Sequence, residues 1–154
     1  MQGEDDHYME LALGEARLAA VAGEVPVGAV IVKAGRVVAQ AHNRIESTPD
    51  ATAHAELLVL KEAAREAGSW RLEGMTLYVT LEPCPMCAGA MVLSRLERLV
   101  YGATDPRKGA VDSVYDVLRH QMNNHRVSVT PGVLAEPSSR LLREFFAERR
   151  GRAG

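Results

Sequence analysis

The chain has 154 residues, 25% of them charged, and a formal net charge of −2. This length suits one domain with a buried core, and we expect a single domain over residues 1–154. The near-neutral charge excludes a protein that binds long nucleic acid through overall basicity, although it is compatible with a local basic patch.

The first residues, MQGEDDHYMELALGEARL, are acidic and their apolar residues are spaced, unlike those of a secretory signal peptide. No later window approaches the roughly 20 apolar residues of a membrane span. We therefore expect the protein to be cytoplasmic and to make no membrane contact. Thiols stay reduced in the cytoplasm.

Helix and strand patterns alternate along the chain, and no repeat or linker divides it. Asp5 or Asp6 is a suitable N-cap for a first helix that runs to about Ala22. One face of this helix contains Met9, Ala12, Ala16 and Ala19.

Two β-rich runs, at 27–33 and 36–41, are joined by an Ala-Gly pair and predict a hairpin. A helix is expected at 53–68, with a glycine as its C-terminal stop. The residues expected to face inward on this helix are Leu57, Leu60 and Ala64.

The remaining elements continue the alternation. They are strands at 75–80, 98–102 and 126–130 and helices at 84–94, 112–120 and 141–150. This order predicts an α/β fold of three layers: a mixed five-stranded sheet, antiparallel at one edge and parallel elsewhere, with helices on both faces. Sites in such sheets gather where strands lead into helix N-termini.

The only two cysteines, Cys84 and Cys87, lie in TLEPCPMC. Pro85 suits the first position of a helix, so the two sulfurs share one face of its first turn, where the helix dipole favours thiolates. Such a pair binds a metal, forms a disulfide or does thioredoxin-like redox chemistry. The cysteines alone do not separate these interpretations.

A second cluster, His54 and Glu56 in AHAE, starts the helix after the hairpin. Taken singly, the two residues are explained as a helix cap and a partner of the helix dipole. His-x-Glu upstream of Pro-Cys-x-x-Cys, however, is the signature of zinc nucleobase and nucleoside deaminases. Residues two apart do not share a helix face, so these side chains converge only if one lies at the irregular helix end.

The number of ligands indicates a catalytic zinc. His54, Cys84 and Cys87 supply three protein ligands to one Zn²⁺ per subunit and leave the fourth position for water or hydroxide, whereas a structural zinc takes four protein ligands. Glu56 is not a ligand; it takes a proton from the water and returns protons to a ring nitrogen and to the leaving amine. The sequence thus predicts hydrolytic deamination. No other histidine has ligand spacing to this group: His7, His42, His120 and His125.

Further segments extend the pattern in order over nearly the whole chain. They are EVPVGAV (24–30), HNR (42–44), ATAHAE (51–56), TLYVTLEPCPMCAGAM (76–91), DPRKG (105–109), DVL (116–118), NHRV (124–127) and EFFAERR (144–150). Together they resemble the bacterial tRNA-specific adenosine deaminases. The resemblance implies a cytidine-deaminase-like fold, a homodimer, a tRNA anticodon stem-loop as partner, and conversion of adenosine to inosine at the wobble position, A34, of tRNA-Arg(ACG).

The resemblance also implies roles around the zinc. Asn43 matches a pocket asparagine that hydrogen-bonds the target nucleoside, although its place in a polar loop also suits a turn cap. Backbone groups of Ala55 and Cys84 match those that face the reacting base and its oxyanion.

The segment DPRKG is a candidate RNA contact. Asp105 matches an acid that meets a ribose hydroxyl, and Arg107 and Lys108 beside it could meet phosphates. Without the resemblance, the segment is interpreted as a surface turn.

The C-terminal segment is a second candidate. Phe145 and Phe146 could stack on a splayed anticodon base, although helical spacing also places an aromatic residue here in the core. Arg149 and Arg150 could hold phosphates or form a solvated helix face.

Three other functions stay open. PCPMC also occurs in guanine deaminases of the same superfamily, so a free-base or nucleoside deaminase that needs no RNA is one alternative. A zinc-stabilised RNA-binding module predicts zinc without turnover, and gives Glu56 little role. A redox pair predicts activity that survives loss of His54.

Overall fold

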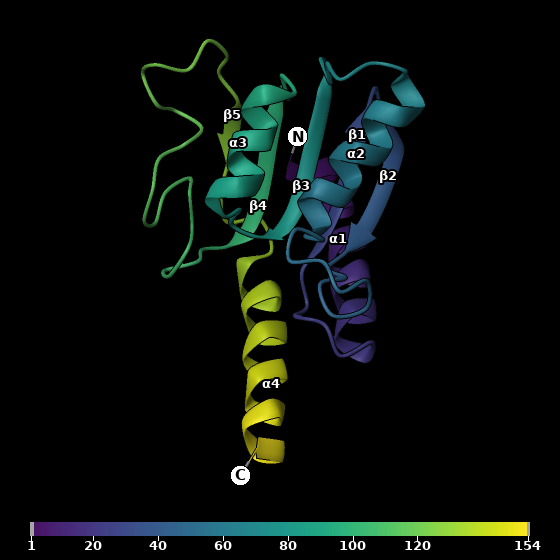
Figure 1. Ribbon diagram of the computed structural model, residues 1–154, viewed down its shortest axis with the longest axis vertical. Helices are drawn as coiled ribbons and strands as arrows, with labels where there is room; N and C mark the ends of the chain where they lie inside the picture. The colour runs from purple at the N-terminus through teal and green to yellow at the C-terminus, as the bar shows by residue number, and fades with distance from the viewer. Residues whose placement is uncertain (1, 154) are drawn as a thin grey trace.

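The computed structural model describes residues 2–153. In this range the chain forms one five-stranded sheet between layers of helices (Figure 1). The elements in chain order are α1 (Gln2–Val21), β1 (Gly28–Lys33), β2 (Arg36–His42), α2 (Ala55–Ala67), β3 (Met75–Leu81), α3 (Pro85–Leu93), β4 (Arg98–Ala103), β5 (Ser128–Thr130) and α4 (Ala135–Ala153). Within this range no helix is long and apolar enough to cross a bilayer.

The strand order is β2-β1-β3-β4-β5. β1 pairs antiparallel with β2 and β3, while β3–β4 and β4–β5 are parallel, so the predicted mixed sheet is confirmed. Because β3 and β4 are parallel, their carboxyl ends lie at the same edge, and the chain leaves β3 there to start α3. This edge is where a site is expected in an α/β sheet.

Two apolar clusters show how the layers pack. On one face α2 and α3 pack on the sheet around Leu77, Val79 and Met91. On the other face α1 packs through Met9 and Ala12, as its spacing predicted. α4 contacts α1, β3 and β4 and then projects past the end of the sheet (Figure 1).

The prediction of a helix at 112–120 is wrong, because this segment belongs to an irregular loop between β4 and β5. Its backbone N–H groups are used elsewhere: those of residues 111–113 donate to the carboxylate of Glu82, and those of Val114 and Tyr115 donate to the carbonyl of Gly109. Backbone N–H groups that donate to these acceptors are not available for the hydrogen bonds of a helix.

Two finer predictions also need correction. Asp5 does not cap α1, which already begins at Gln2; its carboxylate is buried against the guanidinium of Arg98 and the hydroxyl of Tyr78. The inward face of α2 is rotated from the prediction, since Leu60 is buried but Leu57 and Ala64 are only half-buried. The buried face instead starts at Ala55 and Glu56 in the first turn. The buried residues are Ala55, Glu56, Val59, Leu60 and Ala63.

Candidate active site

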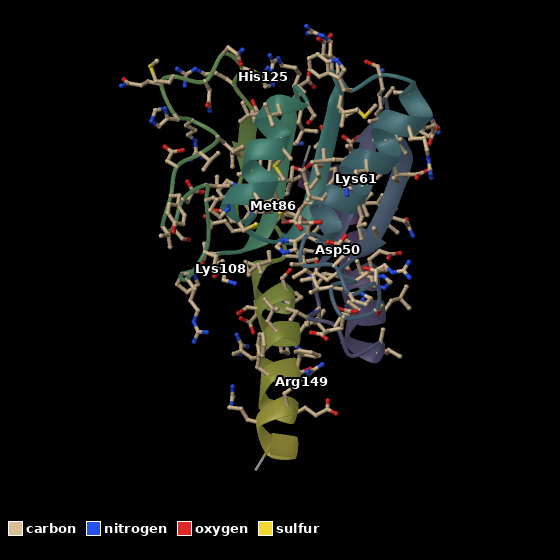
Figure 2. The ribbon with its side chains drawn as sticks, viewed as in Figure 1. Asp50, Lys61, Met86, Lys108, His125 and Arg149 are labelled. Carbon is tan, nitrogen blue, oxygen red and sulfur yellow. The ribbon has the colours of Figure 1, made fainter. Side chains whose placement is uncertain are left out.

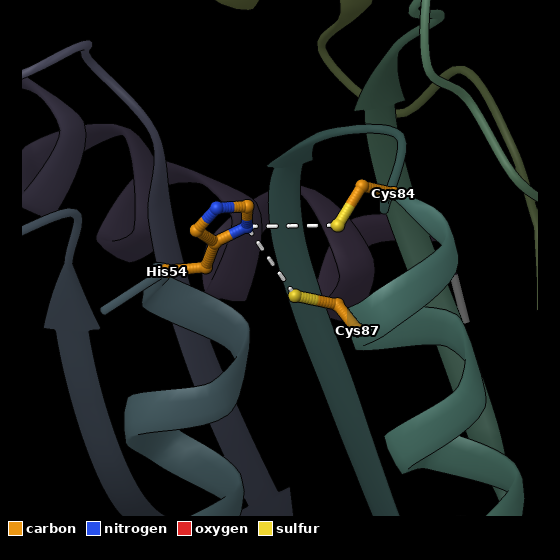
Figure 3. Close-up of side chains that lie close together, drawn as sticks. All are labelled: His54, Cys84 and Cys87. Atoms are coloured by element: carbon orange, nitrogen blue, oxygen red, sulfur yellow. Dashed lines mark hydrogen bonds between the residues drawn. The ribbon is translucent and has the colours of Figure 1, made fainter. Parts of the chain in front are cut away.

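Both predicted clusters meet at the carboxyl end of β3. His54 is the N-cap of α2, and Cys84 is the N-cap of α3, with Pro85 in the first helical turn and Cys87 one turn later. The Nδ1 atom of His54 lies 3.6 Å from the Sγ of Cys84 and 3.5 Å from the Sγ of Cys87 (Figure 3). The starts of two helices therefore bring a nitrogen and two sulfurs together.

This arrangement fits a zinc ion. Tetrahedral coordination with Zn–S bonds of about 2.3 Å and a Zn–N bond of about 2.0–2.1 Å sets sulfur and nitrogen about 3.5 Å apart. The separations in the protein agree with that value, and all three candidate ligand atoms lie within 4.8 Å of one another. Both cysteines are free thiols, so the disulfide interpretation finds no support in the structure.

The electrostatics of the two thiols differ. The side-chain hydrogen bond with Cys87 lowers the pKa of Cys84 to about 4, and the same interaction raises the pKa of Cys87. The hydrogen bond with Cys84 raises the pKa of His54, which the positive charge of Lys108 opposes. These directions favour the thiolate at Cys84 and the protonated thiol at Cys87, and a metal that binds both as thiolates displaces the proton of Cys87.

Glu56 lies in the first turn of α2 with only 4% of its surface exposed. Burial raises the pKa of its carboxyl to about 7. A group that both accepts and donates a proton near neutral pH works best with such a value. His54 has extended backbone dihedrals (φ −77°, ψ 145°), so the two residues lie on either side of the helix boundary. Their side chains are close enough that the charge of each shifts the pKa of the other.

Asn43 and Ala55, both predicted substrate contacts, contact each other. The Oδ1 of Asn43 accepts the N–H of Ala55 at 2.9 Å, and Asn43 is 7% exposed. Asn43 therefore binds the first turn of α2, between His54 and Glu56. This contact differs from the predicted cap of the turn after the hairpin, because it joins Asn43 to the start of a helix twelve positions away. A contact between Asn43 and a nucleoside stays a prediction.

The DPRKG segment forms a tight turn beside the cysteines. The Oδ1 of Asp105 accepts the backbone N–H groups of Arg107 and Lys108 at 3.0 and 3.2 Å. Lys108 lies at the level where α2 and α3 begin, away from the end of the sheet marked by His125, and α4 with Arg149 extends beyond it (Figure 2). The positive charge of this turn is thus presented next to the predicted metal site.

The α4 residues that were predicted to contact RNA differ in their contacts with the rest of the protein. The Arg149 guanidinium donates to the carbonyl of Gly23 and stacks on Phe145 at 4.7 Å from the ring centroid. Phe146 is 43% exposed, and Arg150 is exposed. A cavity of about 160 Å³ lies between α4 and two loops. It is lined by Gly23, Glu24, Val25, Ile45, Glu46, Phe145, Phe146 and Arg149.

Comparison with known proteins identifies the family. The MafB19-like deaminase family model matches residues 3–150. The chain is 50% identical to the tRNA-specific adenosine deaminase of Bacillus subtilis over 96% of this chain and 91% of that protein. It is 48% identical to the one of Aquifex aeolicus over 94% of this chain and 95% of that protein. The chain belongs to the tRNA-specific adenosine deaminase family.

Solved structures agree with this assignment. A structure from work on A-to-I editing by tRNA:A34 deaminases has a TM-score of 0.86 and 47% identity, and covers 88% of this chain and 99% of that one. A guanine deaminase from Nitrosomonas europaea has a TM-score of 0.81 at 25% identity, covering 92% of this chain and 84% of that one. The predicted cytidine-deaminase-like fold is thereby confirmed, and the identities favour the tRNA deaminase family over the guanine deaminase.

Sequence reasoning missed two buried carboxylates that hold loops beside the candidate site. Glu24 accepts the backbone N–H groups of Glu46 and Ser47, in the loop after Asn43. Glu82 accepts hydrogen bonds from the loop that contains Asp105. Burial alone would raise the pKa of both carboxyls, but their hydrogen bonds outweigh it and lower both pKa values. The available signal was an acid next to an apolar strand or turn in EVPVG and TLEPC.

Proposed function

We propose that this chain is one deaminase domain over residues 1–154 that converts adenosine to inosine at the wobble position, A34, of tRNA-Arg(ACG), with release of ammonia. The observation that carries the proposal is the triangle of His54, Cys84 and Cys87 with the buried Glu56 beside it, in a chain about half identical to tRNA-specific adenosine deaminases. The three residues of the triangle would hold one Zn²⁺ per subunit.

The metal supplies Lewis acidity, which activates water at neutral pH when it is bound. Glu56 would accept a proton from the attacking water and deliver it to a ring nitrogen of adenine. It would then take the second proton from the hydroxyl on the ring carbon and deliver it to the departing amine, which leaves as ammonia as the carbon–nitrogen bond breaks. Its burial excludes bulk water, which would compete for these protons. Asn43 holds the N–H of Ala55 and so fixes the helical turn that contains Glu56.

RNA contacts are proposed on both sides of this centre. On one side, the Asp105 turn presents Arg107 and Lys108, both exposed, to anticodon phosphates. On the other, the exposed Phe146 is available for stacking on a base. Phe145 and Arg149 hold α4 against the Gly23 loop and frame the cavity there.

Charge reversal tests whether the substrate is RNA. Arg107→Glu with Lys108→Glu is expected to raise KM for an anticodon stem-loop at least about tenfold and leave kcat nearly unchanged. Binding should also become less salt-dependent, with a log–log slope shallower by about one to two, because fewer counterions are displaced. Steady-state kinetics at several salt concentrations measure both effects.

The matched control is Arg65→Glu, near the C-terminal end of α2, combined with Arg71→Glu just beyond that helix, which changes the net charge equally. These residues form exposed ion pairs with Glu62 and Glu73, so their loss costs little stability. Equal kinetic effects in both double variants, or none in either, would favour a deaminase of free bases or nucleosides.

We also propose a cytoplasmic homodimer. Met86 and Leu93 are 37% and 72% exposed and lie seven positions apart, so one face of α3 presents apolar side chains that a second copy could cover. Sedimentation equilibrium that finds only monomer, or a membrane fraction that holds the protein, would contradict this part of the proposal.

A further inference from the structure

The carboxylate of Glu82 is the centre of the loop that follows β4. It is 2% exposed, and its Oε1 accepts the N–H of Asp105 at 3.0 Å and the hydroxyl of Ser113. Its Oε2 accepts the N–H groups of Val111, Asp112 and Ser113 at 3.1, 2.7 and 3.0 Å. Both oxygens are therefore saturated by donors from one loop.

Gly109 lets that loop pass directly against the carboxylate. A Cβ at this position would overlap the carboxylate carbon and both carboxylate oxygens of Glu82, so no larger residue fits without displacement. The next residue, Ala110, donates its N–H to the carbonyl of Pro83 at 2.8 Å. The loop is thus bound to two consecutive residues that immediately precede the predicted zinc ligand Cys84.

The same carboxylate fixes the start of the Asp105 turn. Glu82 holds the N–H of Asp105, and the side chain of Asp105 in turn holds the N–H groups of Arg107 and Lys108. The directions of both basic side chains therefore depend on a residue that they do not contact. A geometry fixed before binding reduces the entropic cost of ordering a loop on a ligand.

We propose that Glu82 is a positioning residue for the RNA substrate: its buried carboxylate holds the 105–113 loop so that Arg107 and Lys108 face the anticodon backbone beside the metal centre. This inference rests on the proposed function. Glu82 itself touches neither the substrate nor the metal in this scheme.

Glutamine at position 82 keeps the size of the side chain but cannot keep its contacts. An amide has one acceptor oxygen, and its NH₂ group would face N–H donors whichever way it is turned. We expect Glu82→Gln to raise KM for an anticodon stem-loop by about tenfold or more, with kcat changed less than about threefold and zinc content unchanged.

Gly109→Ala disturbs the same contact from the other side while keeping the carboxylate. We expect it to raise KM similarly, and the double variant to resemble either single variant, because both changes break one contact. The control is Asp5→Asn, which makes the same chemical change in a buried carboxylate on the opposite face of the sheet. It should lower stability and leave KM unchanged.

Steady-state kinetics on the stem-loop, zinc analysis and urea unfolding of all five proteins decide the matter. An increase in KM confined to the Glu82 and Gly109 variants supports the positioning role, even if one of these variants folds poorly. Unchanged KM in the folded variants, or independent effects that multiply in the double variant, would overturn it while the wild type still forms inosine. A wild type that leaves the stem-loop unchanged would instead overturn the proposed function, and this inference with it.

Discussion

Glu56→Gln is expected to retain zinc and to lose at least about 10³-fold in the rate of inosine formation. Glutamine preserves the shape of the buried side chain but can neither take a proton from water nor return one to adenine. Because Glu56 lies outside the group of candidate ligands, the metal site should stay intact. Single-turnover kinetics and elemental analysis of the same preparation measure both properties.

The control for this variant is Glu62→Gln on the same helix, where the carboxylate forms an exposed ion pair with Arg65. It should keep wild-type kinetics. Near-normal turnover in Glu56→Gln would show that another group moves the protons, and loss of zinc would show that Glu56 is a ligand.

Cys87→Ala is expected to lose both zinc and activity. Its sulfur is fully buried and lies 3.5 Å from Nδ1 of His54, so removal of it leaves two of three protein ligands and an apolar methyl group in the coordination sphere. Zinc content after dialysis against a weak chelator should fall from about one per chain to near zero, and turnover should fall below detection.

Two comparisons isolate the role of the metal. His54→Ala should behave as Cys87→Ala does, whereas His7→Ala, at an exposed position of α1, should match the wild type. Chelation of the wild type should abolish activity, and added Zn²⁺ should restore it. Activity that survives both His54→Ala and chelation would favour redox chemistry at the cysteine pair instead.

The order of the elements could be predicted because each depends on local chemistry. Pro85 fits the first turn of α3, and Gly68 ends α2 with a φ of +65°. The His54 and Glu56 pattern indicated the metal site for a different reason: zinc chemistry restricts which residue types occur together and at what spacing.

The errors come from contacts between residues distant in sequence. The 112–120 segment has helical spacing, yet the carboxylate that takes the N–H groups around its start lies about 30 positions earlier, at Glu82. Asp5 has the chemistry of an N-cap, but Arg98, on β4, binds it instead. No local window contains either partner, so local propensity could not predict these contacts.

The candidate site shows the same difference between local sequence patterns and contacts between distant residues. The residues that do chemistry were visible as a motif, whereas the residues that hold them were not. Asn43 was predicted to contact the substrate, which stays a prediction, whereas its hydrogen bond to the first turn of α2 was not predicted. Arg149 was predicted to contact a phosphate, which also stays a prediction, whereas its stacking on Phe145 and its hydrogen bond to the carbonyl of Gly23 were not predicted. A polar side chain near a site offers the same atoms to the protein and to a ligand, and only the fold shows which contacts the protein makes.

The most direct test of the central claim is the product formed by the zinc-loaded wild type from an ACG anticodon stem-loop, with guanine and free adenosine as separate substrates. Digestion of the RNA followed by chromatography and mass spectrometry reports inosine, and parallel assays report xanthine and ammonia. We predict inosine at the wobble position of the stem-loop and no product from guanine or free adenosine. Xanthine from guanine without inosine in the RNA would contradict the proposal and place the chain's activity with the free-base deaminases.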